Sequence, residues 1–481
     1  MKGGDEAQRV LALRGEYCIH NNYGVTLELV GAGTRVPLVT GGDVPYADLD
    51  CAASTPALVE VRDAIHSLLD WYSSVHRGAG FKSVVSTAAY EGARSAVRSF
   101  LGARPDDAVV FTRNTTDAMN LLAHALPEGC EVVAFETEHH ANLLPWRRRP
   151  VTFLPPPHSA EAALDALSAA LAGRATGERV VTIPGASNVT GELWPVREIV
   201  ELAHAHGARV VLDAAQLAPH APVDMAGTGV DYVAFSGHKL YAPFGAGVLA
   251  GRGDWLAGAE PLLAGGGAVE LVTTSEVVWT GLPDRHEAGS PNVVGAVALA
   301  VACRTLEAAG MPFVAEREAA LAHELVEGLR AIPGVELYTL WDPAEPRIGV
   351  VTFNLAGYHH GLLATVLSAE HGIGVRHGCF CAHPLVLHLL RVDARDAARL
   401  QDGVRAGRAT LLPGAVRASL GVGSTPGDVR RLVEAVADIA RRGPRWCYEP
   451  GGHRDEFRPV PDPRPLPDLP FPLAVAAREA P

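Results

Sequence analysis

The chain has 481 residues, 48% of them hydrophobic and 20% charged, and its formal net charge is −13. This length and composition predict a packed protein of two domains or lobes and exclude intrinsic disorder. The acidic balance argues against nucleic acid as a partner, and we expect neither a signal peptide nor a membrane span. The seven cysteines are scattered, which is typical of reduced thiols, so we expect a cytoplasmic protein.

Residues 1–45 form an N-terminal segment that we expect to pack with the second domain. Residues 46–292 contain seven short apolar runs that indicate buried strands, and helical stretches separate several of them. The runs are residues 107–112, 130–135, 151–155, 179–185, 208–216, 231–237 and 245–251. Strands that alternate with helices predict a mostly parallel sheet covered on both faces, in a large α/β domain.

The pattern changes after Asn292. Two long helical stretches are followed by strand-like runs at 335–340 and 349–356, which predicts a smaller α+β C-terminal domain over 293–442. Residues 443–481 are rich in proline, so we expect an extended tail there.

Several polar side chains directly follow the predicted strands. They are Thr115 and Thr116, His139, Asn188, Asp213 and Lys239. Ligands of open α/β sheets bind at the carboxyl ends of the strands, so we expect these side chains to meet at one edge. The two threonines also open a helical stretch, where free backbone N–H groups bind anions.

A phosphorylated aromatic aldehyde with a ring nitrogen is one ligand that would use all of these groups. The amine of Lys239 would form a Schiff base with the aldehyde, and Asp213 would keep the ring nitrogen protonated. The two threonines, together with Ser236 and His238, would bind the phosphate. Taken singly, an aspartate after a strand is more often a turn residue, and a lysine is more often a surface charge. Their order along one domain favours the cofactor site.

Stretches between residues 46 and 430 resemble the class V aminotransferase family of pyridoxal-phosphate enzymes, and most closely its cysteine desulfurase and selenocysteine lyase branch. They include "LDCAAST", "SSVHRGAG", "RNTTDAMNLLA", "EHHANLLPW", "SNVTGE", "FSGHKLYAPFGAGVL", "EAGSPN", "VRHGCFCAHPL" and "VRASLGVGST". The resemblance implies a fold-type I architecture with a seven-stranded, mostly parallel sheet. It also implies pyridoxal 5'-phosphate as the cofactor.

The resemblance implies a role for each matching position. Lys239 matches the Schiff-base lysine, and Asp213 matches the partner of the ring nitrogen. The other cofactor positions are Thr116, Ser236 and His238 as phosphate ligands, His139 as ring-stacking residue and acid or base, and Asn188 and Gln216 near the ring hydroxyl and the substrate. Arg417 matches the arginine that binds the substrate carboxylate. Ser290 matches a residue that reaches the phosphate in the neighbouring subunit, which implies a homodimer.

The cysteines of "RHGCFCAHP" bear on the reaction type. Cys381 matches the loop cysteine that attacks the sulfur of bound cysteine, so the resemblance implies alanine and a persulfide that passes to an acceptor. Arg376, which we also expect to contact substrate, would favour the Cys381 thiolate together with His377 and His383. Cys379 could accept the persulfide, form a disulfide with Cys381 or take no part. No second cysteine pair stands nearby, so we expect no metal at this loop.

The expected activity is removal of sulfur from L-cysteine or a related thiol or selenol amino acid. The alternatives are other reactions on the same carbanion, namely those of a C–S lyase, an aminotransferase or an epimerase. A non-catalytic scaffold is a further alternative, which the intact lysine site disfavours. The chain departs from the family at Asn114, where a glycine usually precedes the threonines. It also has a long, partly helix-like stretch between Cys381 and Arg417.

Overall fold

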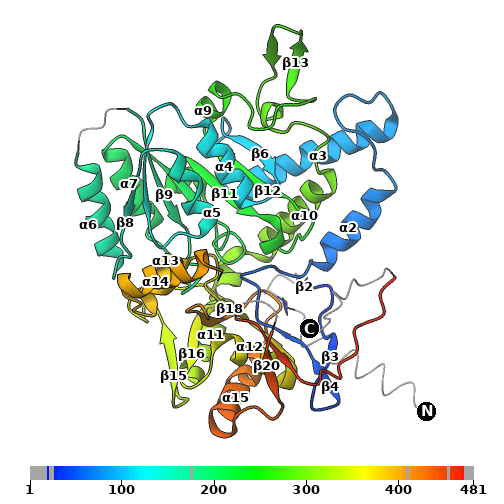
Figure 1. Ribbon diagram of the computed structural model, residues 1–481. Coiled ribbons are helices and arrows are strands. Elements are labelled where there is room, and N and C mark those ends of the chain that lie inside the picture. Colours follow the sequence, from blue (N-terminus) through cyan, green and yellow to red (C-terminus); the bar gives the residue numbers. More distant parts are fainter. Residues whose placement is uncertain (1–18, 21–25, 174–176, 408–410, 452–454, 471–481) are drawn as a thin grey trace.

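The computed structural model of the protein describes residues 19–20, 26–173, 177–407, 411–451 and 455–470. At its centre, seven strands form one sheet in the order β6-β12-β11-β10-β9-β7-β8 (Figure 1). They are β6 (Ala108–Thr112), β7 (Glu131–Phe135), β8 (Val151–Leu154), β9 (Arg179–Pro184), β10 (Ala208–Asp213), β11 (Tyr232–Ser236) and β12 (Gly247–Gly251). Each of the seven predicted runs forms one of these strands. β12 is antiparallel to both neighbours and the other neighbouring pairs are parallel, which confirms the mostly parallel sheet.

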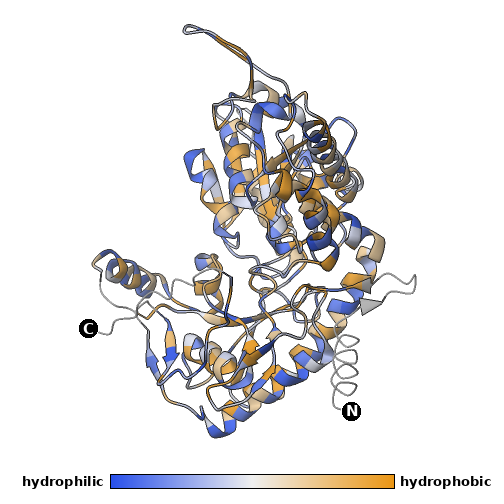
Figure 2. Ribbon diagram, turned by 90° about the vertical axis from the view of Figure 1, so that its right-hand side faces the viewer, coloured by the Kyte–Doolittle hydropathy of each residue, from blue (hydrophilic) through white to orange (hydrophobic). Residues whose placement is uncertain are grey.

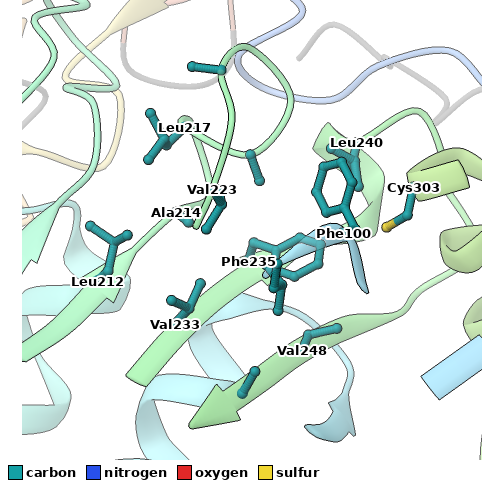
Figure 3. Close-up of a cluster of buried hydrophobic side chains, with 14 of the residues drawn as sticks. Phe100, Leu212, Ala214, Leu217, Val223, Val233, Phe235, Leu240, Val248 and Cys303 are labelled. Atoms are coloured by element: carbon teal, nitrogen blue, oxygen red, sulfur yellow. The ribbon is translucent and has the colours of Figure 1, made fainter. Parts of the chain in front are cut away.

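Both faces of this sheet are buried. In β6, Val109 belongs to one hydrophobic core and Val110 to another, because successive strand residues point to opposite faces. The first core includes side chains of α2 (Val59–Leu69), α3 (Phe81–Phe100), α6 (Ala160–Leu171), α7 (Val196–Ala205) and α10 (Val293–Ala309), and the second those of α4 (Thr115–Ala125) and α9 (Gly253–Gly258). Figure 3 shows part of the first core, where the rings of Phe100 and Phe235 lie 6.5 Å apart. The sheet is therefore a rigid platform whose strand ends can hold a site.

The predicted boundary at residue 292 assigns helix α10 to the small domain. Its buried Leu299 and Leu306 nevertheless pack in the first core, against the central sheet. α11 (Met311–Arg330) follows it. Its first turns contribute Met311 to the same core, and its later turns contribute Leu325 to the core of the second domain. In the described part of the chain, no single helix has the length and apolar composition of a membrane span. α10 and α11 reach that length and composition only when taken together, and the pair is bent by 79°.

The smaller domain is built on a four-stranded antiparallel sheet in the order β15-β16-β19-β18. Its elements are β15 (Val335–Tyr338), β16 (Val350–Leu355), β18 (Arg376–Gly378) and β19 (Ala415–Ser419), with α11, α12 (His360–His371) and α15 (Pro426–Arg442) packed against them. β5 (Ala47–Asp48) pairs with β17 (Ile373–Gly374), and ahead of it the Val39 N–H donates to the Ala369 carbonyl at 2.9 Å, so the chain before the large domain contacts the small one. Figure 1 shows the small domain beneath the central sheet.

Two segments add to this framework. Between Cys381 and Arg417 the chain forms α13 (His383–Leu389) and α14 (Ala394–Arg405), so the long stretch is helical in part. The described part of the proline-rich tail contains a hairpin of β20 (Tyr448–Pro450) and β21 (Phe457–Pro459). The Tyr448 hydroxyl donates to Glu370 of α12 at 2.9 Å, which fixes this part of the tail on the small domain.

Candidate active site

A cavity of about 270 Å³ lies at the carboxyl edge of the central sheet, where the large and small domains meet. Most of the residues predicted from the sequence line it. They are Thr115, Thr116, His139, Asn188, Asp213, Ser236, His238, Lys239, Arg376, Cys381 and Arg417. β6, β7, β9, β10 and β11 end at this edge, which is why residues more than 100 positions apart in the sequence converge there.

Lys239 and Asp213 form the base of the cavity. Asp213 is the last residue of β10, and its carboxylate accepts a hydrogen bond from the backbone N–H of Ala215 at 2.9 Å. Burial raises the pKa of Asp213, against the Ala215 N–H and the charge of Lys239. Burial lowers the pKa of Lys239 to about 8, against the attraction of Asp213. The site therefore holds an amine that is easily deprotonated beside a carboxylate that lacks a full cationic partner.

The N-terminus of α4 forms one wall of the cavity. Asn114 caps this helix, because its side-chain oxygen accepts the backbone N–H of Asp117 at 3.0 Å. Its φ of −174° is extended backbone, which asparagine adopts freely, so the glycine of the family is not needed here. The Thr115 N–H and hydroxyl both contact the Ser236 hydroxyl, at 2.8 and 2.7 Å. Hydroxyl groups are thus gathered at a helix N-terminus, where an anion can bind.

His139 caps the short helix α5 (His140–Leu143) at the cavity wall. Its Nδ1 accepts the backbone N–H of Ala141 at 3.0 Å, so the neutral ring carries its proton on Nε2. Burial lowers the pKa of His139 to about 3, and the positive charge of Lys239 acts in the same direction. The imidazole is therefore neutral at physiological pH, which suits a ring packed against a cationic aromatic ligand.

Two arginines reach the cavity from the small domain, on directly paired positions of β18 and β19. Arg417 is 3% exposed and donates to the Asn188 carbonyl at 2.8 Å. Its Nε has no partner, and burial lowers the Arg417 pKa to about 10. Asp50 pairs with Arg376 at 2.9 Å and with Arg417 at 3.5 Å. Asp50 was not among the predicted site residues, although it lies in the quoted stretch "LDCAAST".

The loop that carries Cys381 is held by its backbone. The Cys381 carbonyl accepts the His140 N–H at 2.7 Å, and the Phe380 carbonyl accepts an Asn188 side-chain N–H at 2.8 Å. Both Cys381 and Phe380 have positive φ, 54° and 52°, and the Cys381 side chain is exposed. The main chain is thus anchored while the thiol remains accessible to the cavity.

Not every predicted feature of this loop holds. His377 and His383 have pKa values lowered by burial, so both are neutral at physiological pH. The expected positive charge near the thiol therefore comes from Arg376 and Arg417 and not from these histidines. Cys379 is half-buried, its thiol donates to the Pro413 carbonyl at 3.0 Å, and burial raises its pKa to about 11.

Two predicted residues lie outside the lining of the cavity. Gln216 is buried behind it, donates to the Ala52 carbonyl at 2.8 Å and leaves its side-chain oxygen without a partner. Ser290 lines a separate cavity of about 570 Å³ with Tyr72 and Arg77, and shares no lining residue with the first. Within one chain, Ser290 is therefore not part of the lysine site. Sequence reasoning also missed Ala52, Ala53 and Phe380, which line the cavity but offer no reactive group.

This fold and this cavity define an α/β enzyme with a lysine–aspartate site. The model of the family described as Aminotransferase class-V matches residues 48–432. A protein of Halalkalibacterium halodurans named "Probable cysteine desulfurase" is 36% identical over 354 residues, which cover 71% of this chain and 85% of that protein. A Staphylococcus epidermidis protein of the same name is 35% identical over 402 residues, 81% of this chain and 91% of that one.

Among solved structures, the apo structure of a cysteine desulfurase from Thermococcus onnurineus aligns with a TM-score of 0.72 and 30% identity, covering 82% of this chain and 95% of that one. The chain belongs to the aminotransferase class-V family. It is therefore a pyridoxal-phosphate-dependent enzyme with the fold-type I architecture. The expectations for family, fold and cofactor are confirmed.

The residues present fit this cofactor. Asp213 is a buried carboxylate with a raised pKa, and a protonated ring nitrogen would supply the positive charge that it lacks. The buried side-chain oxygen of Gln216, next to the lining residue Ala52, has no partner and can accept a hydrogen bond from a hydroxyl group. The start of α4 offers N–H groups and hydroxyls to a phosphate.

Proposed function

We propose that the protein is a cysteine desulfurase, which removes sulfur from L-cysteine or a related thiol or selenol amino acid and leaves it on Cys381. The observation that carries this proposal is that Cys381 and Lys239 line the same cavity, together with Arg417. A lysine and an aspartate alone would serve many reactions of the family. An exposed thiol above them supplies the nucleophile that sulfur transfer needs.

The cofactor would be held by Lys239 at its aldehyde, by Asp213 at its ring nitrogen and by Thr115, Thr116, Ser236 and His238 at its phosphate. When bound, pyridoxal phosphate supplies an electron-withdrawing ring that stabilises negative charge on the α-carbon of the amino acid. His139 would lie against the ring as a neutral imidazole and keep its proton on Nε2. Lys239, whose pKa is about 8, can hold or release a proton near neutral pH.

Arg417 would bind the substrate carboxylate. Its guanidinium is already fixed by the Asn188 carbonyl and by Asp50, and its buried Nε has a free proton to donate. A planar guanidinium can bind a carboxylate through two parallel hydrogen bonds, which orients the amino acid as well as holding it. The Arg417 guanidinium carbon lies 4.9 Å from the centre of the Phe380 ring, so Phe380 packs against the guanidinium.

The sulfur step uses Cys381 as a thiolate. The thiolate attacks the sulfur of the bound cysteine, so that a new S–S bond forms while the C–S bond of the substrate breaks. The electron pair of the broken bond goes to the substrate carbon, which takes up a proton. Cysteine and the Cys381 thiol are thereby converted to alanine and a Cys381 persulfide, which an acceptor thiol or protein then consumes.

The protein would act as a homodimer. Ser290 lines a different cavity from the lysine site of its own chain, as expected for a residue that serves a partner's site. The hairpin of β13 (Val269–Val272) and β14 (Val277–Trp279) projects from the large domain and exposes four apolar side chains (Figure 2). Exposed apolar groups of this kind mark protein interfaces.

The described cysteines are all free, which supports a reducing, cytoplasmic location.

The test is a pair of serine variants assayed for sulfide and alanine formation from L-cysteine with a reducing thiol present. Cys381→Ser should lower sulfide release at least about 100-fold while the visible absorbance of the bound cofactor is retained. Cys379→Ser is the matched control, and it should keep most of the activity because its thiol is half-buried and bonded to Pro413. Full sulfide release by Cys381→Ser, or pyruvate and ammonia as products, would favour a C–S lyase instead.

A further inference from the structure

A second cluster of metal-ligand side chains lies in the small domain, apart from the cavity. His359 and His360 stand at the start of α12, and Asp455 precedes β21 in the tail hairpin. One ligand atom from each of the three residues lies within 4.8 Å of the others. In the described ranges of the chain, no other group of three histidine, cysteine or acidic residues meets this spacing.

The distances approach those of a zinc site. His359 Nε2 is 3.6 Å from an Asp455 carboxylate oxygen, and His360 Nδ1 is 3.4 Å from Nδ1 of His377. Zinc–nitrogen and zinc–oxygen bonds of about 2.1 Å place neighbouring ligands of a tetrahedron about 3.4 Å apart. The ligand atoms of His359, His360 and Asp455 lie within 4.8 Å of one another, so side-chain rotation has to bring them closer before they can share one cation.

The ring of His360 is oriented as a metal ligand. Its Nε2–H donates to the Leu412 carbonyl at 3.1 Å, which leaves the lone pair on Nδ1, the atom that lies 3.4 Å from Nδ1 of His377. Metal-binding histidines usually donate their other ring N–H to a carbonyl or carboxylate in this way. His360 is 5% exposed, so little water competes with a cation for this nitrogen.

His359 supplies the second nitrogen. Its Nε2 is buried and has no hydrogen-bond partner, which is unfavourable unless a ligand is present. Its Nδ1 accepts the N–H of Gly361 at 3.1 Å. Coordination through Nε2 moves the ring proton to Nδ1 and gives up this single capping bond. The loss is small beside the free energy of several metal–ligand bonds.

We propose that His359, His360 and Asp455 bind one divalent transition metal of the zinc class, with His377 beside the remaining coordination position. Two neutral imidazoles and one carboxylate are ligands that this class of ion prefers. The site would tie the β20–β21 hairpin to α12 and to β18. β18 leads directly into the loop of Cys379 and Cys381, so the metal would stabilise the base of that loop. The proposal stands independently of the proposed desulfurase activity.

The experiment uses the full-length protein with its cofactor bound. The protein is stripped with a chelator, titrated with zinc chloride, and its bound zinc is measured by elemental analysis. One zinc per chain is expected for the wild type. His359→Asn removes the Nε2 ligand, but its amide oxygen can still cap α12. This variant and Asp455→Asn should bind zinc more than about 100-fold more weakly.

Two controls separate this site from other zinc ligands. His323→Gln removes an exposed histidine of α11, and the double variant Cys379→Ser, Cys381→Ser removes the loop thiols. Both should still bind one zinc. Retained cofactor absorbance shows that each variant is folded. Zinc should also slow amide hydrogen exchange at residues 448–451 and 455–459 in the wild type and in both controls, but not in His359→Asn or Asp455→Asn. Absence of stoichiometric zinc in the wild type, equal binding by His359→Asn, or loss of zinc in the cysteine variant would each overturn the proposal.

Discussion

Lys239 owes its reactivity to burial. In water a lysine amine has a pKa near 10.5, so fewer than about one molecule in a thousand is neutral at pH 7. With the pKa lowered to about 8, roughly one in ten is neutral and able to attack an aldehyde. Asp213 opposes this shift and Arg417 reinforces it. The reactivity of this single amine thus depends on charges from both domains.

We expect the rate at which the cofactor-free protein takes up pyridoxal phosphate to rise with pH and to be half-maximal near pH 8. The rate rises with pH because the neutral Lys239 amine is the nucleophile, and the neutral fraction falls as pH drops below the pKa of this amine. Arg417→Gln removes a cation that lowers the Lys239 pKa, so its midpoint should move to higher pH. Stopped-flow absorbance measures both profiles. A wild-type midpoint near pH 10 would contradict the role of burial.

At the scale of elements, the start of α4 combines a structural cap with the proposed phosphate site. Asn114 accepts the Asp117 N–H and so satisfies one of the free donors of the first turn. Gly247 lets the neighbouring strand approach closely, because a Cβ there would lie 2.5 Å from the Asn114 Cα. The cap therefore depends on Asn114, which follows β6, and on Gly247, which begins β12, and not on the helix alone.

Asn114→Ala should lower the free energy of unfolding of the cofactor-free protein by about 1 kcal/mol, since the cap is lost. Asn114→Asp should keep that stability but weaken the affinity for pyridoxal phosphate at least about tenfold, because it places a negative charge beside the phosphate site. Thermal unfolding and cofactor titration separate the two effects. Equal cofactor affinity in Asn114→Asp would show that the phosphate does not bind at this helix end.

Helix α11 joins the two domains through a buried polar pair. Glu318 of this helix contacts His220, in the loop after β10, at 2.5 Å, and both side chains are 2% exposed. We expect Glu318→Ala to destabilise the protein by about 2–5 kcal/mol, because His220 is left buried without its partner. Glu324→Ala, an exposed position of the same helix, should cost less than about 0.5 kcal/mol. Chemical denaturation measures both, and similar values for the two variants would refute the importance of this pair.

At the scale of the whole molecule, the projecting hairpin is the clearest sign of a partner. Leu271, Val272, Val277 and Val278 are between 40 and 60% exposed, and the hairpin extends away from the body in Figures 1 and 2. Trp71 and Phe81, near the ends of α2 and α3, are exposed as well. A large exposed apolar surface of this kind is costly unless another chain covers it.

We expect the double variant Val272→Glu, Val277→Lys to shift the protein from dimer to monomer. The two residues are paired across the hairpin, so the opposite charges keep the hairpin itself favourable while they disfavour an apolar interface. Val404→Glu, an exposed apolar position on α14, is the control and should remain a dimer. Sedimentation velocity measures the mass. A monomeric wild type would contradict the homodimer proposal.

The sequence by itself determined the strands and the residues at their ends. Each of the seven apolar runs became a strand, because a strand buried on both faces must be apolar throughout. The side chains that follow these runs met at one edge, because parallel strands end together. The meeting of Lys239 and Asp213 in one cavity was therefore predictable from local patterns.

Only the tertiary structure decided what depends on contacts between distant segments. The antiparallel direction of β12, the ion pairs of Asp50 with two arginines of the small domain, and the neutral state of His377 and His383 all belong to this group. So does the separation of Ser290 from Lys239. Local periodicity reports which face of an element is buried. The charge, partners and neighbours of a side chain depend on which other segments are packed against it.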